Sequence, residues 1–418
     1  MKLNKYFMLG LAGLAFAACS NDDENITSGR EDGRVRVTLS LGRTETTRSV
    51  GQTAAGLYND ITDIKIIFYN SAGAYIAVPA TGTVGDKEYD NETAINNAIK
   101  EGLNDNVASH KVTVELKGIP SSATQMYVVA NGANKSNQVG TASLEDAKKT
   151  TIFLKNQIKS EFTRFSGEES RLTGLAQIDA SGKANVQLRP VPSRIELANV
   201  TAVPLPTGET WGGANIKSFT VVGFYINAFF PMGSLDPTKD EGTTRTAIDN
   251  RDISENYTKA KYRNIIDQTI AGDFTGDWSM MCDEPTNEYT YAEGAEGSGN
   301  IYTATMNNNQ KWGYMILQGN SVDVVVKLNV TYADDTTATK FLTITSYTYK
   351  SGFTDGFGNS HTAGSKVETM LRGHVYQINN INFDVTDLTD VPYETTKTVN
   401  AEVEVLPWVA VEVEPGFE

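Results

Sequence analysis

The sequence has little of the chemistry that catalytic and metal sites require. It contains three histidines, and none has a second histidine at the spacing of a metal site. No GxSxG nucleophile elbow, HExxH motif or Walker phosphate loop occurs in the chain. The acidic stretch 249–256 lacks the DxDxDG spacing of a calcium loop, and a solvated loop explains it better. We therefore expect no catalytic residue, no metal site, no cofactor and no enzymatic activity.

Cysteine is equally rare. The two cysteines, Cys19 and Cys282, stand far apart in the sequence. Acylation of Cys19, which the residues before it favour, would leave Cys282 without a disulfide partner. A chain of 418 residues is long enough for two or more domains with cores of their own. We therefore expect hydrophobic cores, and not disulfides, to stabilise the fold.

Positive charge is in the minority. The chain has 36 lysines and arginines against 51 aspartates and glutamates, which gives a net charge of −15. This balance argues against nucleic acid or an anionic membrane surface as a partner. The low density of charge, together with frequent threonine, tyrosine and glycine, favours an all-β architecture.

Long apolar runs are also lacking near the start of the chain. The run FMLGLAGLAFAA at residues 7–18 is too short to span a bilayer, and it follows Lys2 and Lys5. It therefore predicts a signal peptide over residues 1–18. The residues Phe16-Ala17-Ala18 before Cys19 resemble a bacterial lipobox, in which the cysteine is acylated. An ordinary secretory signal with a chance cysteine is the less favoured alternative.

An acidic tract follows Cys19. Its sequence SNDDEN resembles the tract that directs Bacteroides-type lipoproteins to the outer surface of the outer membrane. A solvated tether would have the same composition, so both interpretations stay open.

Short alternating segments predict the strands. Residues 35–41 (VRVTLSL) place four apolar side chains on one face and polar ones on the other. Further segments of strand-like composition lie at 63–70, 111–120, 126–132, 184–191, 194–200, 219–226, 323–332, 341–347 and 374–385. Two connecting stretches, 93–103 and 143–156, are helical in pattern, and the second opens with Ser143 and Asp146 at capping-box spacing. The whole predicts antiparallel β-sandwiches with minor helical insertions.

Two prolines suggest a domain boundary. Pro190 and Pro192 interrupt the strand pattern, and a new series of strands begins at Arg194. The polar, glycine-rich region 231–312 lies within the second series, and we interpret it as an insertion that carries loops.

The last stretch, AEVEVLPWVAVEVEPGFE, alternates strictly between apolar and acidic residues. Pro407 lacks a backbone donor and should break this strand into two halves. The segment could complete its own sandwich, or it could pair with another molecule by β-strand addition. The polar linker 387–400 and the length of the segment favour the second interpretation. The predicted donor residues are Ala401, Val403, Val405, Trp408, Val409, Val411 and Val413. On this hypothesis, a chain without 401–418 should fold and be secreted but not polymerise.

Four features, in this order, resemble the Bacteroidales fimbrillin family, the type V pilins of the FimA/Mfa-like fimbrial subunits. They are the lipobox with its acidic tract, VRVTLSLGRTETTRSVG, LRPVPSRIEL, and GHVYQINNINFDV followed by the EVEVLPW ending. The resemblance covers essentially the whole chain in outline. The pair Pro192-Ser193 departs from the family pattern, and the region 231–312 matches nothing in it.

The resemblance implies a mechanism and a set of boundaries. Such precursors are exported as lipoproteins anchored in the outer membrane, and an arginine-specific protease then removes the lipid and the first strand together. The matching cut lies between Arg48 and Ser49, with Arg43 as the second choice. The implied segments are a signal peptide at 1–18, a lipid-anchored propeptide at 19–48, two transthyretin-like β-sandwiches at 49–190 and 191–386, and a linker with donor strand at 387–418. The expected partners are like pilin subunits and accessory tip and anchor pilins, and the adhesion target stays unknown.

A rival hypothesis belongs to another class of protein. A surface-anchored lipoprotein of this composition could bind glycans, with exposed aromatic residues as a platform. The candidates are Trp211, Trp278 and Trp312, although core packing is the commoner role of tryptophan. Retention of Cys19 in the mature protein would favour this alternative.

Overall fold

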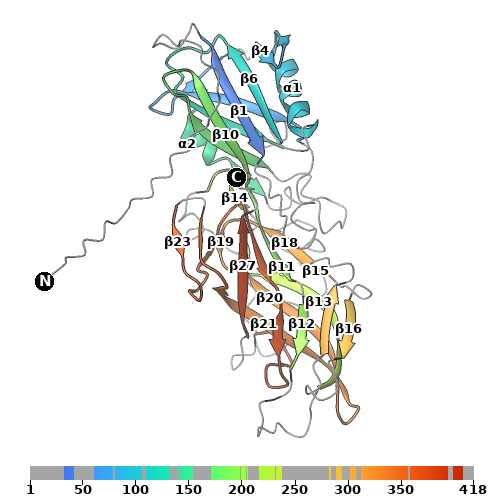
Figure 1. The fold of residues 1–418 in the computed structure, drawn as a ribbon. Helices are drawn as coiled ribbons and strands as arrows, with labels where there is room; N and C mark the ends of the chain where they lie inside the picture. The colour runs from blue at the N-terminus through green and yellow to red at the C-terminus, as the bar shows by residue number, and fades with distance from the viewer. Residues whose placement is uncertain are drawn as a thin grey trace, which may run out of the picture.

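A computed structural model provides the fold, and strands dominate it (Figure 1). The structure describes residues 33–41, 61–78, 81–105, 110–131, 139, 142–153, 171–197, 199–203, 205, 216–230, 232–237, 282–283, 289–293, 302–306, 312–355, 358–393 and 399–407. The all-β prediction with minor helices is confirmed. Within these ranges, no helix has both the length and the apolar character needed to cross a membrane.

The first unit is one nine-stranded sheet that folds over into two layers. The strand order is β3-β2-β7-β9-β10-β1-β6-β4-β5. The layers join where the end of β10 leaves β1 and pairs with β9 through Arg189 and Pro190. Buried side chains of both layers form one core. The strands are β1 (Val35–Leu41), β2 (Ile64–Tyr69), β3 (Tyr75–Ile76), β4 (Thr81–Val84), β5 (Lys87–Tyr89), β6 (Lys111–Lys117), β7 (Gln125–Ala130), β9 (Leu172–Gln177) and β10 (Lys183–Pro190).

Both predicted helices are present, but the second is shorter than the predicted 143–156, because Thr151–Phe153 form a strand that pairs with Met232–Ser234. Helix α1 (Glu92–Asp105) buries Ile95, Ile99 and Leu103, which recur at helical spacing and pack into the first core. Helix α2 is one short piece, Leu144–Lys148. Its cap is the one that the sequence predicts, because the backbone N–H of Asp146 donates to Ser143 Oγ at 3.0 Å.

The second unit is also built from layered sheets. Its larger sheet has the order β15-β13-β20-β21-β27-β25-β11-β18 and a smaller one has the order β16-β17-β12-β26. The strands are β11 (Ser193–Leu197), β12 (Asn199–Ala202), β13 (Ile216–Asn227), β15 (Cys282–Asp283), β16 (Tyr289–Glu293), β17 (Tyr302–Met306), β18 (Trp312–Ile316), β20 (Asp323–Tyr332), β21 (Thr337–Tyr349), β25 (His374–Ile378), β26 (Ile381–Phe383) and β27 (Val399–Pro407). The short pairs are β8 (Thr151–Phe153) with β14 (Met232–Ser234), β19 (Gly319–Asn320) with β24 (Thr369–Met370), and β22 (Phe353–Thr354) with β23 (Ser360–His361).

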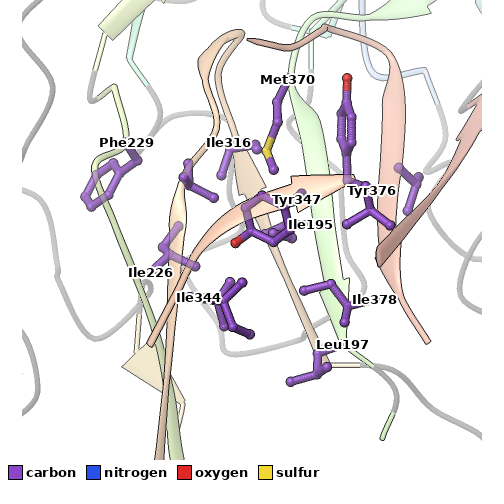
Figure 2. Packing of buried hydrophobic residues seen from close by; sticks show 14 of the residues in the cluster. Ile195, Leu197, Ile226, Phe229, Ile316, Ile344, Tyr347, Met370, Tyr376 and Ile378 are labelled. Atoms are coloured by element: carbon purple, nitrogen blue, oxygen red, sulfur yellow. The ribbon is translucent and has the colours of Figure 1, made fainter. Parts of the chain in front are cut away.

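Side chains from different strands meet in the core of this second unit. Figure 2 shows Ile195 and Leu197 of β11 near Ile344 and Tyr347 of β21. All four are buried, and Ile195 and Leu197 stand two residues apart on one face of β11. This burial of apolar side chains is the main source of stability expected for the second unit.

The region 231–312 is not purely an insertion of loops. Its described parts include β14, β15, β16 and β17, and each of these strands pairs with a strand outside the region or with one another. Strand β14 pairs with β8 of the first half of the chain. Several segments of this region are therefore strands that complete the sheets, and the region does not consist of loops alone.

Candidate functional site: strand β1 and the C-terminal strand

Strand β1 lies in the middle of the first sheet. It pairs in parallel with β10 from Arg36 opposite Lys183 to Leu41 opposite Leu188. On its other side it pairs antiparallel with β6, from Val35 opposite Leu116. Figure 1 shows β1 between these two neighbours. Removal of β1 would therefore open a gap inside a continuous sheet and would not merely shorten an edge.

The apolar face of β1 is fully integrated in the core. Val35, Val37 and Leu39 are completely buried, and Leu41 is nearly so. Their neighbours across the sheet are buried apolar residues of β6 and β10: Val112, Val114, Leu116, Ala184, Val186 and Leu188. Strand β1 occupies a space between β6 and β10, and we call this space the β1 slot. Four apolar side chains at every second position fill it.

The polar face of β1 contributes little to this attachment. The hydroxyls of Thr38 and Thr113 lie 3.4 Å apart at the surface. Arg34 forms an exposed ion pair with Glu115 at 3.1 Å, and such pairs are worth at most about 1 kcal/mol. The backbone is held more firmly, since the N–H of Leu41 donates to the carbonyl of His110 at 2.9 Å. Burial and backbone pairing thus hold β1 in place.

The predicted processing residues lie outside the described residues. After Leu41 the next described residue is Ile61, so Arg43, Arg48 and Ser49 fall between them. Cys19 also lies outside the described part of the chain. The order along the chain is nevertheless clear: a cut after Arg48 falls beyond the end of β1 and before β2.

The first half of the predicted donor strand pairs within its own chain. Ala401 and Val403 are buried in β27, opposite Tyr347 and Tyr349 of β21. Val405 lies opposite Tyr376 of β25. The expectation that 401–407 has no partner in its own chain is therefore corrected. Strand β27 lies between β21 and β25 and pairs with both of them. It thereby satisfies backbone groups that these two strands would otherwise leave unpaired.

The second half of the predicted donor strand follows Pro407, which lies near the junction of the two units. Pro407 lies opposite His374, the first residue of β25. Gly373 donates from its N–H to the carbonyl of Pro192, at the link between β10 and β11. Trp408, Val409, Val411 and Val413 lie outside the described residues. The C-terminal tail, residues 408–418, therefore starts beside the first unit.

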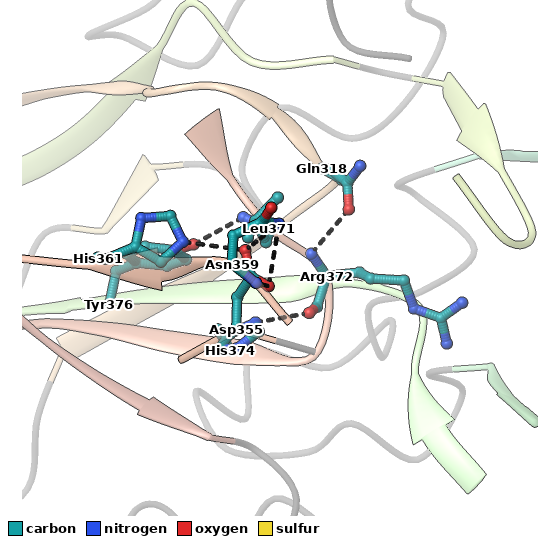
Figure 3. A network of polar contacts seen from close by, with 8 residues as sticks. All are labelled: Gln318, Asp355, Asn359, His361, Leu371, Arg372, His374 and Tyr376. Carbon is teal, nitrogen blue, oxygen red and sulfur yellow. Dashed lines mark hydrogen bonds and ion pairs between the residues drawn. The ribbon is translucent and has the colours of Figure 1, made fainter. Parts of the chain in front are cut away.

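A polar cluster lies next to this starting point (Figure 3). Asp355 Oδ2 contacts His361 Nε2 at 2.9 Å, and Asp355 Oδ1 accepts the N–H of Asn359 at 2.9 Å. The ring of Phe353 stacks on His361 at 4.6 Å and also faces His374. These residues belong to the β22–β23 hairpin, in which Phe353 lies opposite His361. Among the described residues, no group of three or more potential ligands could hold a metal ion.

His374 lies at the start of β25. It is buried, and Nδ1 donates to the carbonyl of Arg372 at 2.7 Å. Burial lowers its pKa, and the backbone hydrogen bond and the charge of Asp355 oppose that effect. Of the tryptophan candidates, Trp312 lies in β18, whereas Trp211 and Trp278 lie outside the described residues.

Sequence reasoning did not anticipate that Arg194 and Arg372 are buried. Arg194 Nε donates to Glu196 at 2.9 Å, and Gln377 donates to the same carboxylate at 3.0 Å. Arg372 joins the two units through several hydrogen bonds. The only signal in the sequence is an arginine inside an otherwise strand-like or turn-like segment, which does not distinguish a buried arginine from an exposed one.

Comparisons with known proteins place this fold. No family model and no curated protein matches the sequence. The chain is similar to a candidate cell adhesion protein from Parabacteroides distasonis, with a TM-score of 0.50 and 11% identity over 91% of this chain and 99% of that one. A candidate cell adhesion protein from Bacteroides eggerthii gives 0.46 and 14% identity over 94% and 100%. The tip fimbrial protein Mfa3 from Porphyromonas gingivalis, with a C-terminal truncation, gives 0.34 and 10% identity over 90% and 100%.

At these identities the likeness concerns the fold alone. The Parabacteroides distasonis protein and this chain share an all-β architecture over nearly their whole lengths. The all-β fold expected from the sequence is therefore one that this chain shares with a solved structure.

Proposed function

We propose that this chain is a structural subunit of a surface fimbria that serves adhesion. It is exported as a lipoprotein acylated at Cys19, cut after Arg48, and polymerised by strand exchange. The observation that carries the proposal is the place of β1: it is a central strand with four buried apolar residues, and it precedes the cut. An arginine-specific protease and like subunits are the partners, with tip and anchor pilins at the ends of the fibre.

An empty β1 slot is a strong binding site for an extended segment. Loss of β1 exposes the apolar row of β6 and β10 and leaves backbone N–H and C=O groups unpaired along both strands. A strand from another molecule restores both kinds of contact at once.

The C-terminal tail of a second copy matches this site. Val409, Val411 and Val413 have the same two-residue spacing as Val35, Val37 and Leu39. Burial of three valines would contribute on the order of 5 to 9 kcal/mol before ordering costs. Donor residues 401–405 are needed inside their own chain, so the exchanged segment is confined to residues 408–413.

The N-terminus of the mature surface protein and its behaviour on a gel test this proposal together. We expect mass spectrometry to find Ser49 as the first residue, and a ladder of polymers in samples that are not boiled. An acylated Cys19 on a monomeric band would overturn the proposal and favour the anchored glycan-binding alternative.

A matched pair of variants tests the donor segment itself. Val411→Asp places a charge in the slot and should abolish the ladder, because an unpaired buried carboxylate is costly. Glu412→Gln changes a residue of the opposite face and should leave the ladder intact. Equal ladders for both variants would exclude residues 408–413 as the donor.

A further inference from the structure

Arg372 connects the two units of the fold. Its Nε donates to the carbonyl of Pro190 at 3.2 Å, and Nη2 donates to the carbonyl of Arg189 at 3.0 Å. Nη2 also donates to Thr173 Oγ1 at 2.7 Å, and Nη1 forms an ion pair with Asp236 at 2.5 Å. The side chain is only 8% exposed. A rigid guanidinium fork that meets four acceptors fixes both distance and orientation.

The carboxylate partner is itself held by the first unit. The N–H of Asp236 donates to the carbonyl of Lys148 at 3.0 Å, and the N–H of Leu235 donates to the carbonyl of Thr150 at 2.9 Å. These residues continue β14, which pairs with β8. All four acceptors of the Arg372 guanidinium therefore belong to, or are anchored on, the first unit.

The backbone of Arg372 is held by the second unit. Its N–H donates to Gln318 Oε1 at 3.1 Å, and its carbonyl accepts from His374 Nδ1 at 2.7 Å (Figure 3). Gly373 adopts a φ of 67°, the left-handed region that glycine enters without strain. This turn leads directly into β25 and so sets where β25 begins.

These contacts join the wall of the β1 slot to the base of the C-terminal tail. Leu188, the last residue of β10 that pairs with β1, immediately precedes Arg189, an acceptor of Arg372. On the other side, His374 lies opposite Pro407, after which the tail starts. The buried Arg372 therefore lies between the end of the β1 slot and the end of β27.

We propose that Arg372 is the positioning residue that fixes the angle between the β1 slot and strand β27, which precedes the C-terminal tail, within each subunit. In a polymer this angle is repeated at every subunit, so Arg372 sets the stiffness and the curvature of the fibre. This second statement rests on the proposed function, whereas the first concerns the single chain. Loss of the guanidinium removes one contact from each of these four acceptors and so loosens the connection between the two units, which the β8–β14 pair and shared apolar packing also maintain.

The inter-unit angle is measured on the uncleaved, full-length chain. Nitroxide labels are placed on Asp86→Cys in the first unit and Lys366→Cys in the second, both of which replace exposed residues. Cys19→Ser and Cys282→Ser remove the native thiols. Double electron–electron resonance should give one narrow distance distribution for the parent chain and a distribution at least twofold wider for Arg372→Ala. Arg372→Lys, which keeps the charge but not the fork, should lie between them.

Lys217→Ala is the matched control, because it removes an exposed ion pair with Asp335 within the second unit. It should keep the parent distribution. If Arg372→Ala does not fold, Asp236→Asn weakens the same contact without removing the arginine and should also widen the distribution. The proposal is overturned if a folded Arg372→Ala chain gives the same distance distribution as the parent chain. If Arg372→Ala does not fold, the same result for a folded Asp236→Asn chain overturns it.

Fibres give a separate readout. Polymers of Arg372→Ala should show a persistence length reduced several-fold in electron micrographs, while Lys217→Ala polymers keep that of the parent. If the parent chain forms no polymers, the proposed function is contradicted. The distance distributions of the uncleaved chain would then still test whether Arg372 fixes the angle between the two units. Parent-like fibres from the Arg372→Ala chain would exclude its role in fibre stiffness.

Discussion

Val403 of β27 lies opposite Tyr349 of β21 in the same chain, and both side chains are buried. The part of the alternating C-terminal segment up to Pro407 is therefore a strand of the second unit. On the proposed mechanism, the exchanged part lies beyond Pro407. Three experiments follow from the pairing of β27 and the place of β1, and a fourth follows from the burial of His374.

Two truncations should behave differently. A chain without residues 408–418 keeps β27 and should fold like the full chain but form no ladder. A chain without 399–418 loses the strand between β21 and β25 and should unfold at a clearly lower temperature or aggregate. Circular dichroism melting and native gels distinguish these outcomes. A normal melting temperature for the longer truncation would contradict the structural role of β27.

Leu39→Ala should destabilise the precursor by about 2 to 5 kcal/mol, because it leaves a cavity at a fully buried site. Thr38→Ala, on the opposite face, should change stability by less than about 0.5 kcal/mol. Urea unfolding of the uncleaved chain measures both. On the proposed mechanism β1 leaves after cleavage, so mature polymers of both variants should resist heat equally. A persistent defect of Leu39→Ala polymers would show that β1 stays in its slot.

Arg48→Ala should block maturation. The precursor should accumulate with its lipid, and the ladder should disappear, because β1 then remains covalently attached. Arg43→Ala changes the second candidate and should mature normally. Mass spectrometry of the N-terminus decides between the two sites. If the Arg48→Ala chain matures by cleavage after Arg43, then Arg43 becomes the first choice for the processing site and Arg48 the second.

His374 should make the second sandwich sensitive to acid. Burial lowers its pKa, so the folded chain holds it neutral while the unfolded chain binds a proton near pH 6.5. Its contribution is fully present above about pH 6.5 and is lost as the pH falls from there towards the lowered pKa. His374→Gln cannot titrate and should lose less stability between pH 7 and pH 5 in urea unfolding. An equal loss in both chains would exclude this group as the cause.

Much of the first sheet could be predicted from local pattern. The alternation in VRVTLSL and KVTVELK marks strands whose inward residues are all buried. Pattern does not say which strands become neighbours. The pairing of β1 with β10, at the far end of the unit in sequence, depends on how the sheet folds over at Arg189 and Pro190.

The C-terminal segment illustrates the same limit. Its period of two is a local property of the backbone, so the sequence alone determines that it is a strand with one apolar face. Whether that face pairs with its own chain depends on two strands, β21 and β25, that lie far apart in the sequence and leave a space of the right width.

The sequence by itself determined the all-β class, most of the strands and helices, and the places where the chain must turn. These follow from side-chain periodicity, capping and proline, which act over a few residues. Only the tertiary structure decided that β1 is a central strand, that residues 401–407 are internal, and that Arg372 and His374 are buried at the junction. Burial and long-range pairing are properties of the packed whole, because they depend on which distant surfaces exclude water together.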